Sequence, residues 1–207
     1  AHEIKNPLTP MRLSVQSFER RFNPEAADVK EKLAEYSETL IQQIDVMSSI
    51  ASAFSDFAKM PTQRREKLNV VSVVKHALDI FTEDYIYYIP QETELFAHLD
   101  KTQLIRILTN LVKNATQAIK ETDTAPRIEV KVTSDGNNVK IMVSDNGKGI
   151  ANKNKELIFE PKFTTKTSGM GLGLAMIKNI IEAYNGSINF TSTEGVGTVF
   201  TVILPKT

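Results

Sequence analysis

The apolar residues in the first part of this chain recur every three or four positions, which is the period of an amphipathic α-helix and not of a β-strand. Asn23-Pro24 interrupts this pattern and Met60-Pro61 ends it, because proline cannot continue a helix. We therefore expect a first helix up to Phe22 and a second from Glu25 to Lys59, the latter roughly 50 Å long. The first apolar series is Ile4, Leu8, Met11, Val15, Phe18 and Phe22, and the second is Leu33, Ser37, Leu40, Ile44, Met47, Ala51, Phe54 and Ala58.

A hairpin of two such helices cannot bury both apolar stripes by itself, because each stripe covers only one side of its helix. A second copy of the chain is the simplest way to cover them. We expect residues 1–62 to form half of a dimeric four-helix bundle. The alternative is a hairpin that packs on the second domain of its own chain.

The pattern changes after Pro61 to strands that alternate with helices, which predicts a separate domain over residues 66–207. Asp100 followed by Gln103 resembles a capping box for a helix that runs to about Lys120. A later helix should begin near Leu172 and end at Asn185-Gly186. Alternating apolar residues predict two hairpins, 128–132 with 139–143 and 188–192 with 198–204. This mixture predicts an α+β chain whose second domain is a two-layer α/β sandwich.

Composition and charge exclude several classes of protein. The 25 Lys and Arg residues balance the 25 Asp and Glu residues, so the chain lacks the basic excess that captures nucleic acid. It has no Cys and no apolar run long enough for a membrane span, so we expect no membrane contact. Because it begins with Ala1-His2 inside a helical pattern, we expect a cytoplasmic fragment, with any membrane anchor in absent upstream segments.

The first helix begins with His2-Glu3, and Asn6 follows one turn later, away from the apolar stripe. A carboxylate beside an exposed imidazole can hold it in one tautomer and leave its second nitrogen as a nucleophile. A solvated helix face would give the same pattern. The zinc-protease motif needs a second His where Asn6 stands, so a metal-protease reading fails.

In the second domain, Asn110, Asn114 and Gln117 form a polar stripe on the predicted helix. Amide oxygens are neutral ligands, and Mg²⁺ takes only a few protein oxygens beside substrate phosphates. Asp145-Asn146-Gly147-Lys148-Gly149 directly follows a strand, which presents a carboxylate that can accept a hydrogen bond from an exocyclic amine such as that of adenine. The alternatives are a wet helix face and a plain glycine turn.

Three alternating glycines, Gly169, Gly171 and Gly173, lead into the later helix, where backbone amides and the helix N-terminus can bind an anion. The segment between the two glycine motifs is rich in Lys, Ser and Thr. With Phe159 and Phe163 as anchors, it is typical of a mobile lid over phosphates.

Taken in order along the chain, these motifs resemble the catalytic core of a bacterial sensor histidine kinase. His2 to Pro10 is similar to the phosphoacceptor box, particularly that of nitrogen-regulation-type sensors. Asn110 to Ala115 resembles the Mg²⁺-binding box, and Asp145 to Gly149 the first glycine box. Ile158 to Lys166 resembles the Phe-containing lid box, and Gly169 to Leu174 the second glycine box.

The resemblance implies a two-layer ATP-binding domain of the Bergerat or GHKL type, with ATP and Mg²⁺ as cofactors. His2 would accept the γ-phosphoryl group, with Glu3 as general base, and would pass it to an Asp of a response regulator receiver domain; Asn6 would serve the reverse phosphatase activity. Asn114 would hold Mg²⁺ with support from Asn110, and Asp145 would bind the adenine amine. The remaining implied contacts to the nucleotide are Gly147, Gly149, Phe159, Phe163, Lys166, Gly169, Gly171 and Gly173.

Two features depart from the family pattern. Lys162 stands where many relatives have an aromatic residue, so we expect the lid to close differently. His2 would lie in a frayed first turn, so we expect this fragment to bind ATP better than it phosphorylates itself.

Two rival functions remain: a GHKL-type ATP hydrolase, which would need a Glu base where Asn110 stands, and a non-catalytic dimeric nucleotide-binding scaffold.

Overall fold

The computed structural model describes residues 2–22, 28–58, 63–119, 125–160 and 171–207. The chain divides into two compact units, one containing residues 1–61 and the other residues 62–165 and 169–207. No helix in the described part of the chain is long and apolar enough to cross a bilayer.

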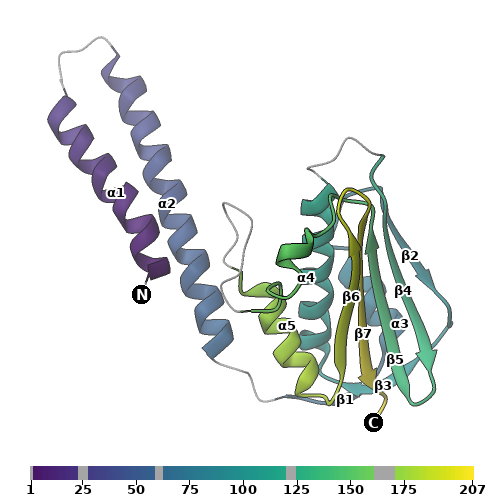
Figure 1. The fold of residues 1–207 in the computed structure, drawn as a ribbon. Helices are drawn as coiled ribbons and strands as arrows, with labels where there is room; N and C mark the ends of the chain where they lie inside the picture. The colour runs from purple at the N-terminus through teal and green to yellow at the C-terminus, as the bar shows by residue number, and fades with distance from the viewer. Residues whose placement is uncertain (1, 23–27, 59–62, 120–124, 161–170) are drawn as a thin grey trace. The chain divides into compact units, whose positions relative to one another are not determined.

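The first unit is a pair of packed helices, α1 (His2–Arg21) and α2 (Val29–Ala58) (Figure 1). The ring of Phe18 in α1 stacks on that of Tyr36 in α2, with 4.2 Å between the centroids. We predicted that the second helix begins at Glu25, but α2 begins at Val29, and residues 23–27 lie outside the described part.

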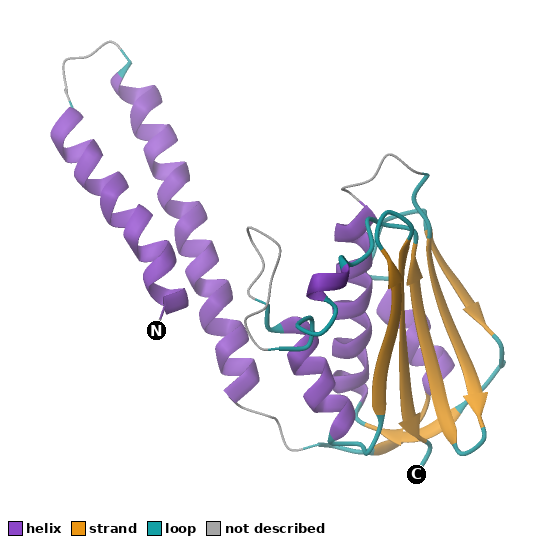
Figure 2. Cartoon of the chain, viewed as in Figure 1, coloured by secondary structure: helices purple, strands orange, loops and turns teal. Residues whose placement is uncertain are grey.

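The second unit is built on a five-stranded sheet in the order β2-β4-β5-β7-β6. Strand β2 runs parallel to β4 and the other neighbours pair antiparallel. The helices α3, α4 and α5 lie on one face of this sheet (Figures 1 and 2). The elements of the sheet and its cover are α3 (Val70–Leu78), β2 (Ile86–Pro90), α4 (Lys101–Ile119), β4 (Ile128–Asp135), β5 (Asn138–Asp145), the short 3₁₀ helix η1 (Asn152–Asn154), α5 (Gly173–Glu182), β6 (Ser187–Thr193) and β7 (Gly197–Pro205).

The core lies between the sheet and the helices. Along β5, Val139, Ile141 and Val143 are buried while their neighbours are partly exposed, which explains the alternation in the sequence. Leu108 and Leu111 of α4 are fully buried against this face. The predicted α+β fold with a two-layer sandwich is confirmed.

The sequence pattern did not locate the first elements of this unit, which include a separate two-stranded sheet of β1 (Glu66–Asn69) and β3 (Phe96–Leu99). Each of these strands has only four residues, so alternation has little length in which to show. Strand β2 ends in Pro90 at the edge of the main sheet, where a missing N–H costs no ladder bond.

Candidate functional site

Asp145, the last residue of β5, is only 8% exposed. Its carboxylate accepts a hydrogen bond from the Gly147 N–H at 2.9 Å and another from the backbone of Thr198. Burial raises the pKa of Asp145 above its ordinary value, and the two backbone donors oppose that rise. Because a carboxylate can accept about four hydrogen bonds, two backbone donors leave it able to bind an external donor.

The turn after Asp145 is seated on the end of α4. Gly147 is buried, and a Cβ atom there would lie 2.7 Å from the carbonyl carbon of Ala118. The next amide, that of Lys148, donates to the Ala118 carbonyl at 3.2 Å. Only glycine permits this close approach, and it places the turn directly against α4.

Gly149 holds the other side of the turn against the β6–β7 hairpin. It has a left-handed backbone, with φ of 68°, and a Cβ atom there would overlap the carbonyl oxygen of Thr193. The neighbouring groups bind the hairpin: the Gly195 N–H donates to the Lys148 carbonyl at 2.8 Å, and the Ile150 N–H donates to Ser192 Oγ at 2.9 Å. The turn is therefore bound on both sides.

Ser192 links this turn to the strand opposite Asp145. Its hydroxyl donates to the Gly197 carbonyl at 3.0 Å and lies 2.9 Å from the Thr198 hydroxyl. Thr198 is 4% exposed and is the register partner of Asp145. Sequence reasoning missed both residues, because only the register of β5 against β7 brings Thr198 to Asp145.

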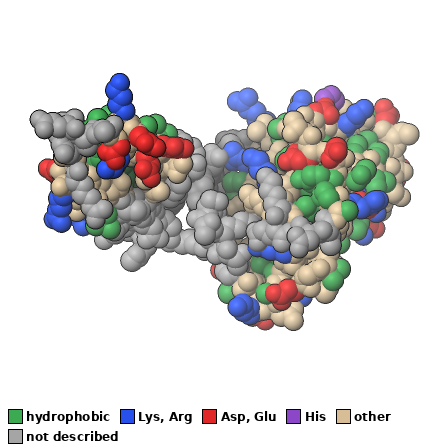
Figure 3. Space-filling model, turned by 90° about the horizontal axis from the view of Figure 1, so that it is seen from above, with side chains coloured by type: hydrophobic (Ala, Val, Ile, Leu, Met, Phe, Trp, Pro, Cys, Tyr) green, Lys and Arg blue, Asp and Glu red, His purple; other side chains and the backbone are tan. Residues whose placement is uncertain are grey.

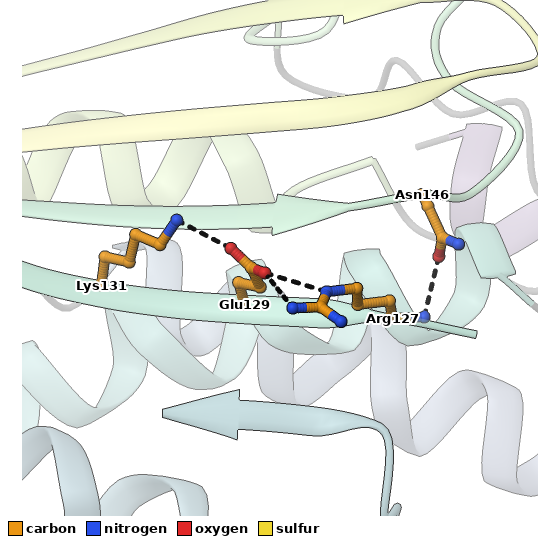
Figure 4. A network of polar contacts seen from close by, with 4 residues as sticks. All are labelled: Arg127, Glu129, Lys131 and Asn146. Atoms are coloured by element: carbon orange, nitrogen blue, oxygen red, sulfur yellow. Dashed lines mark hydrogen bonds and ion pairs between the residues drawn. The ribbon is translucent and has the colours of Figure 1, made fainter. Parts of the chain in front are cut away.

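Asn146 has a structural role that the sequence did not indicate. Its Oδ1 accepts from the Arg127 N–H at 2.8 Å (Figure 4). Its Nδ2 donates to the Ala125 carbonyl at 2.7 Å, and the two bonds together hold the entry to β4. In the same network Glu129 accepts from Lys131 and Arg127, and these bonds lower the pKa of Glu129.

Asn110 and Asn114 lie one turn apart on α4, and both are half-buried. The Nδ2 of Asn110 donates to the Arg106 carbonyl at 2.9 Å. A Cβ atom on Gly173 would lie 2.8 Å from Asn110 Oδ1, so the first residue of α5 packs closely against this amide.

The N-terminus of α5 carries no side-chain cap. Leu172 occupies the N-cap position and makes no capping hydrogen bond, and Gly171 before it has φ of 62°. The first amides of a helix without a capping side chain can bind an anion. This end of α5 could therefore hold a phosphate group.

Phe159 packs on the sheet edge. Its ring makes edge contacts with those of Phe190 at 5.9 Å and Phe200 at 6.5 Å, and Lys178 Nζ lies 5.7 Å from its centroid. Phe163, Lys166 and Gly169 lie outside the described residues.

The predicted phosphoacceptor residues lie in the first unit. His2, Glu3 and Asn6 belong to α1, and their side chains lie outside the described part. Among the described residues, no three His, Asp or Glu side chains gather as metal ligands would.

Helix α4 brings the two glycine motifs of the second unit together. Gly147 contacts Ala118 near the C-terminal end of α4, and Gly173 contacts Asn110 near its middle. Positions 110 and 118 are eight residues apart, which is about 12 Å along a helix. A buried acceptor and an uncapped helix N-terminus therefore lie along one helix.

Both parts of the chain match known families. Residues 99–207 match the family described as histidine kinase-, DNA gyrase B-, and HSP90-like ATPase, and residues 1–63 match the His Kinase A (phospho-acceptor) domain. The sensor histidine kinase ZraS of Salmonella typhimurium is 34% identical over 212 residues, which cover 99% of this chain and 44% of that protein. A putative sensor histidine kinase, NtrY-like, of Rickettsia felis is 31% identical over 206 residues, which cover 98% of this chain and 34% of that protein. The chain thus spans less than half the length of these relatives.

Solved structures show the same architecture. The catalytic domain of the histidine kinase ThkA superposes with a TM-score of 0.61 at 30% identity, and covers 69% of this chain and 96% of its own. ThkA in complex with the response regulator protein TrrA superposes with a TM-score of 0.76 at 24% identity, over 100% of this chain and 60% of that one. At 24% identity, the likeness to the ThkA complex shows the fold alone.

Proposed function

This chain belongs to the sensor histidine kinase family, and we propose on that basis that it transfers the γ-phosphoryl group of ATP to His2. The observation that carries the proposal is the arrangement along α4. The turn after Asp145 packs near the C-terminal end of α4 and the start of α5 packs near its middle, about 12 Å apart along the helix, a span that a nucleoside triphosphate can bridge. An acceptor for an amine and a donor set for anions match the two ends of ATP.

At the base end, Asp145 would accept a hydrogen bond from the exocyclic amine of adenine. Its burial supports this role, because a hydrogen bond in a site away from water discriminates strongly between bases. The hydroxyl of Thr198 lies on the neighbouring strand and would complete the polar lining. Gly147 and Gly149 would let the turn approach the base.

At the phosphate end, the amides of Gly171 and Gly173 would bind phosphate oxygens, joined by Gly169 and by Lys166 from the lid. The residues here fit Mg²⁺, since an amide oxygen such as that of Asn114 is a hard ligand and the uncapped start of α5 suits the phosphates. Bound Mg²⁺ would neutralise the charge that develops on the phosphoryl oxygens. Asn110, whose side-chain amide is held by its bond to the Arg106 carbonyl, would support the metal site one turn before Asn114.

At the histidine, the lone pair of one ring nitrogen would attack the γ-phosphorus, the bond to the bridging β–γ oxygen would break, and ADP would leave. Glu3 would orient the other nitrogen and take up the ring proton. The phosphoryl group would pass to an Asp of a response regulator receiver domain, and Asn6 would position water for the reverse phosphatase reaction. Positioning dominates the rate of such transfers.

The helical hairpin would dimerise. Leu8 and Val15 of α1, and Phe22 directly after α1, are spaced seven residues apart and are all more than 40% exposed; Ile41 and Ile44 of α2 exceed 50%. Figure 3 shows hydrophobic side chains between charged ones on the described surface of the hairpin. Exposed apolar residues at heptad spacing are typical of a helix-to-helix interface, so a second hairpin would complete a four-helix bundle.

The rival functions have less support. A hydrolase of this fold class would need a base where Asn110 stands, and a side-chain amide is not basic enough to take a proton from water. A non-catalytic scaffold would not need a match to the phospho-acceptor domain.

The test is labelling with ATP that carries a radioactive γ-phosphate. We expect magnesium-dependent label on His2 that survives base and is lost in acid. Asn114→Ala should weaken magnesium-dependent nucleotide binding by about tenfold or more, while Gln117→Ala, the exposed amide on the same helix, should not. Steady phosphate release without labelled protein would identify a hydrolase, and neither signal would identify a scaffold.

A further inference from the structure

The first described segment of the second unit, residues 63–65, is bound within that unit. The N–H of Arg64 donates to Asp100 Oδ2 at 2.9 Å, although the two residues are 36 positions apart. The antiparallel pairing of Glu66 with Leu99 explains this contact, because it brings the residues before Glu66 alongside those after Leu99. This segment, directly before β1, is therefore attached to the start of α4.

Asp100 uses its other oxygen to cap the same helix. Its Oδ1 accepts from the N–H groups of Thr102 at 2.9 Å and Gln103 at 3.1 Å. In the capping box that we predicted, Gln103 would bind the Asp100 N–H. Instead that N–H donates to the Tyr184 hydroxyl at 3.1 Å, and the hydroxyl donates to Gln103 Oε1 at 2.8 Å. Tyr184, two residues after the end of α5, thus completes the box.

Arg65 attaches the segment to the end of α5. Its guanidinium lies 4.7 Å above the ring of Tyr184, and its Nη2 donates to the carbonyl of Ala183, the C-cap of α5, at 3.1 Å. Its Nε donates to Gln63 Oε1 at 2.9 Å. We call Arg64, Arg65, Asp100, Gln103 and Tyr184 the linker anchor.

Helices α4 and α5 meet at the linker anchor, and the candidate phosphate and metal residues lie farther along the same two helices. Asn110 lies ten positions after Asp100 on α4, and Gly173 lies ten positions before Ala183 on α5, so each is about 15 Å from the anchor. The close approach of Gly173 to Asn110 joins the two helices near the phosphate end. The anchor therefore fixes the chain to the same rigid pair that would hold the nucleotide.

Asp100, Gln103 and Tyr184 are buried, at 9%, 7% and 4% exposure. The three bonds among them join groups that would otherwise lack a partner away from water, whereas the bonds of Arg65 lie at the surface. An incidental surface contact would not bury a carboxylate, an amide and a phenol together. Buried polar networks of this kind fix one geometry.

We propose that the linker anchor fixes the point at which the chain enters the ATP-binding unit, and that Asp100, Tyr184 and Arg65 are positioning residues for phosphoryl transfer to His2. The proposal rests on the proposed function. Its physical basis is that a loosely attached connection lowers the effective concentration of the imidazole at the γ-phosphate. The anchor residues themselves touch neither reacting group.

The first experiment separates transfer from nucleotide binding in the whole chain. Tyr184→Phe keeps the ring and removes the hydroxyl, and Arg65→Gln removes the charge. We expect each to lower His2 labelling at saturating ATP by about tenfold, the factor for the loss of about one hydrogen bond, while the ATP dissociation constant changes by less than about twofold.

The control variant is Arg127→Gln. Arg127 also lies over a tyrosine ring, that of Tyr87 at 5.1 Å, and also makes an exposed hydrogen bond, but it is not in the anchor. It should label at the wild-type rate, and Arg65→Lys should restore part of the loss because it keeps the charge. Wild-type labelling by Tyr184→Phe and Arg65→Gln, or an equal loss of ATP binding and labelling, would overturn the positioning role.

The second experiment tests the anchor without reference to phosphorylation. Trypsin cleaves after Arg64 and Arg65, and Asp100→Asn keeps the Oδ1 acceptor for the α4 cap while placing an NH₂ donor against the Arg64 N–H. We expect Asp100→Asn and Tyr184→Phe to increase cleavage at these two bonds about tenfold by mass spectrometry, with cleavage after Arg127 unchanged. Equal cleavage in all proteins would refute the anchor. If the wild-type chain is not labelled on His2, the proposed function and the positioning role fail together, and this digestion still decides whether the anchor exists.

Discussion

Gly149 offers a test of how tightly the first glycine turn is built, and Gly136 is its matched control. Both have left-handed backbones, with φ of 68° and 59°. A Cβ atom at position 149 would overlap the Thr193 carbonyl oxygen, whereas one at position 136 would meet no atom within 4 Å. The difference between Gly149→Ala and Gly136→Ala therefore isolates the collision from the backbone strain.

The magnitude follows from the bonds at stake. Left-handed backbone costs alanine about 1–2 kcal/mol, partly offset by the smaller entropy of its unfolded chain, so Gly136→Ala should cost about 1 kcal/mol. At Gly149 the turn must also move away from the β6–β7 hairpin. That movement breaks the Gly195-to-Lys148 and Ile150-to-Ser192 bonds, each worth about 1 kcal/mol. We expect a total near 3 kcal/mol for Gly149→Ala.

The assay is urea unfolding followed by tyrosine fluorescence, which reports mainly on the second unit because every tyrosine except Tyr36 lies there. The free energy of unfolding should fall by about 2 kcal/mol more for Gly149→Ala than for Gly136→Ala at an unchanged slope. Equal losses for the two variants would show that the turn is not held against the hairpin as described.

Two further predictions concern Asp145. Asp145→Asn replaces one acceptor oxygen by a donor, so ATP affinity measured by calorimetry should fall about 10- to 100-fold, whereas Asp135→Asn in the exposed β4–β5 turn should leave it unchanged; wild-type affinity in Asp145→Asn would remove Asp145 from the base site. Burial raises the pKa of Asp145 above 3.8, so ATP affinity should fall as the pH is lowered through that raised pKa. The free energy of unfolding should show the opposite dependence: the contribution of the protonated carboxyl is present below 3.8 and is lost as the pH rises through the pKa of the folded state. Asp145→Asn should abolish both dependences, and a persistent pH dependence of affinity in that variant would assign it to another group.

Much of the second unit was readable from local pattern. The alternation of Val139, Ile141 and Val143 predicted a strand with one buried face, and the structure buries these three residues. The Asp100 cap was also correct, because a side chain two or three residues from the amides it binds leaves a signature in the sequence. Local rules succeed where the interacting groups are neighbours in the chain.

The candidate site was readable only in part. Asp145 stood out because a carboxylate follows a strand and precedes two glycines, but its neighbour Thr198 did not, since 53 positions separate them and only the strand register joins them. The role of Asn146 as a brace for the entry to β4 depends likewise on the contact with Ala125 and Arg127.

Period, capping residues and the order of the motifs were enough to establish two units, their classes and the family to which the chain belongs. These signals either involve residues close together in the chain or depend only on the order of the motifs along it. The packing of Gly173 on Asn110, the hydroxyl of Tyr184 in the cap of α4 and the attachment of Arg64 to Asp100 came only from the folded chain. Each joins segments that are distant in the chain, and no local propensity encodes which of many possible partners a buried polar group will meet.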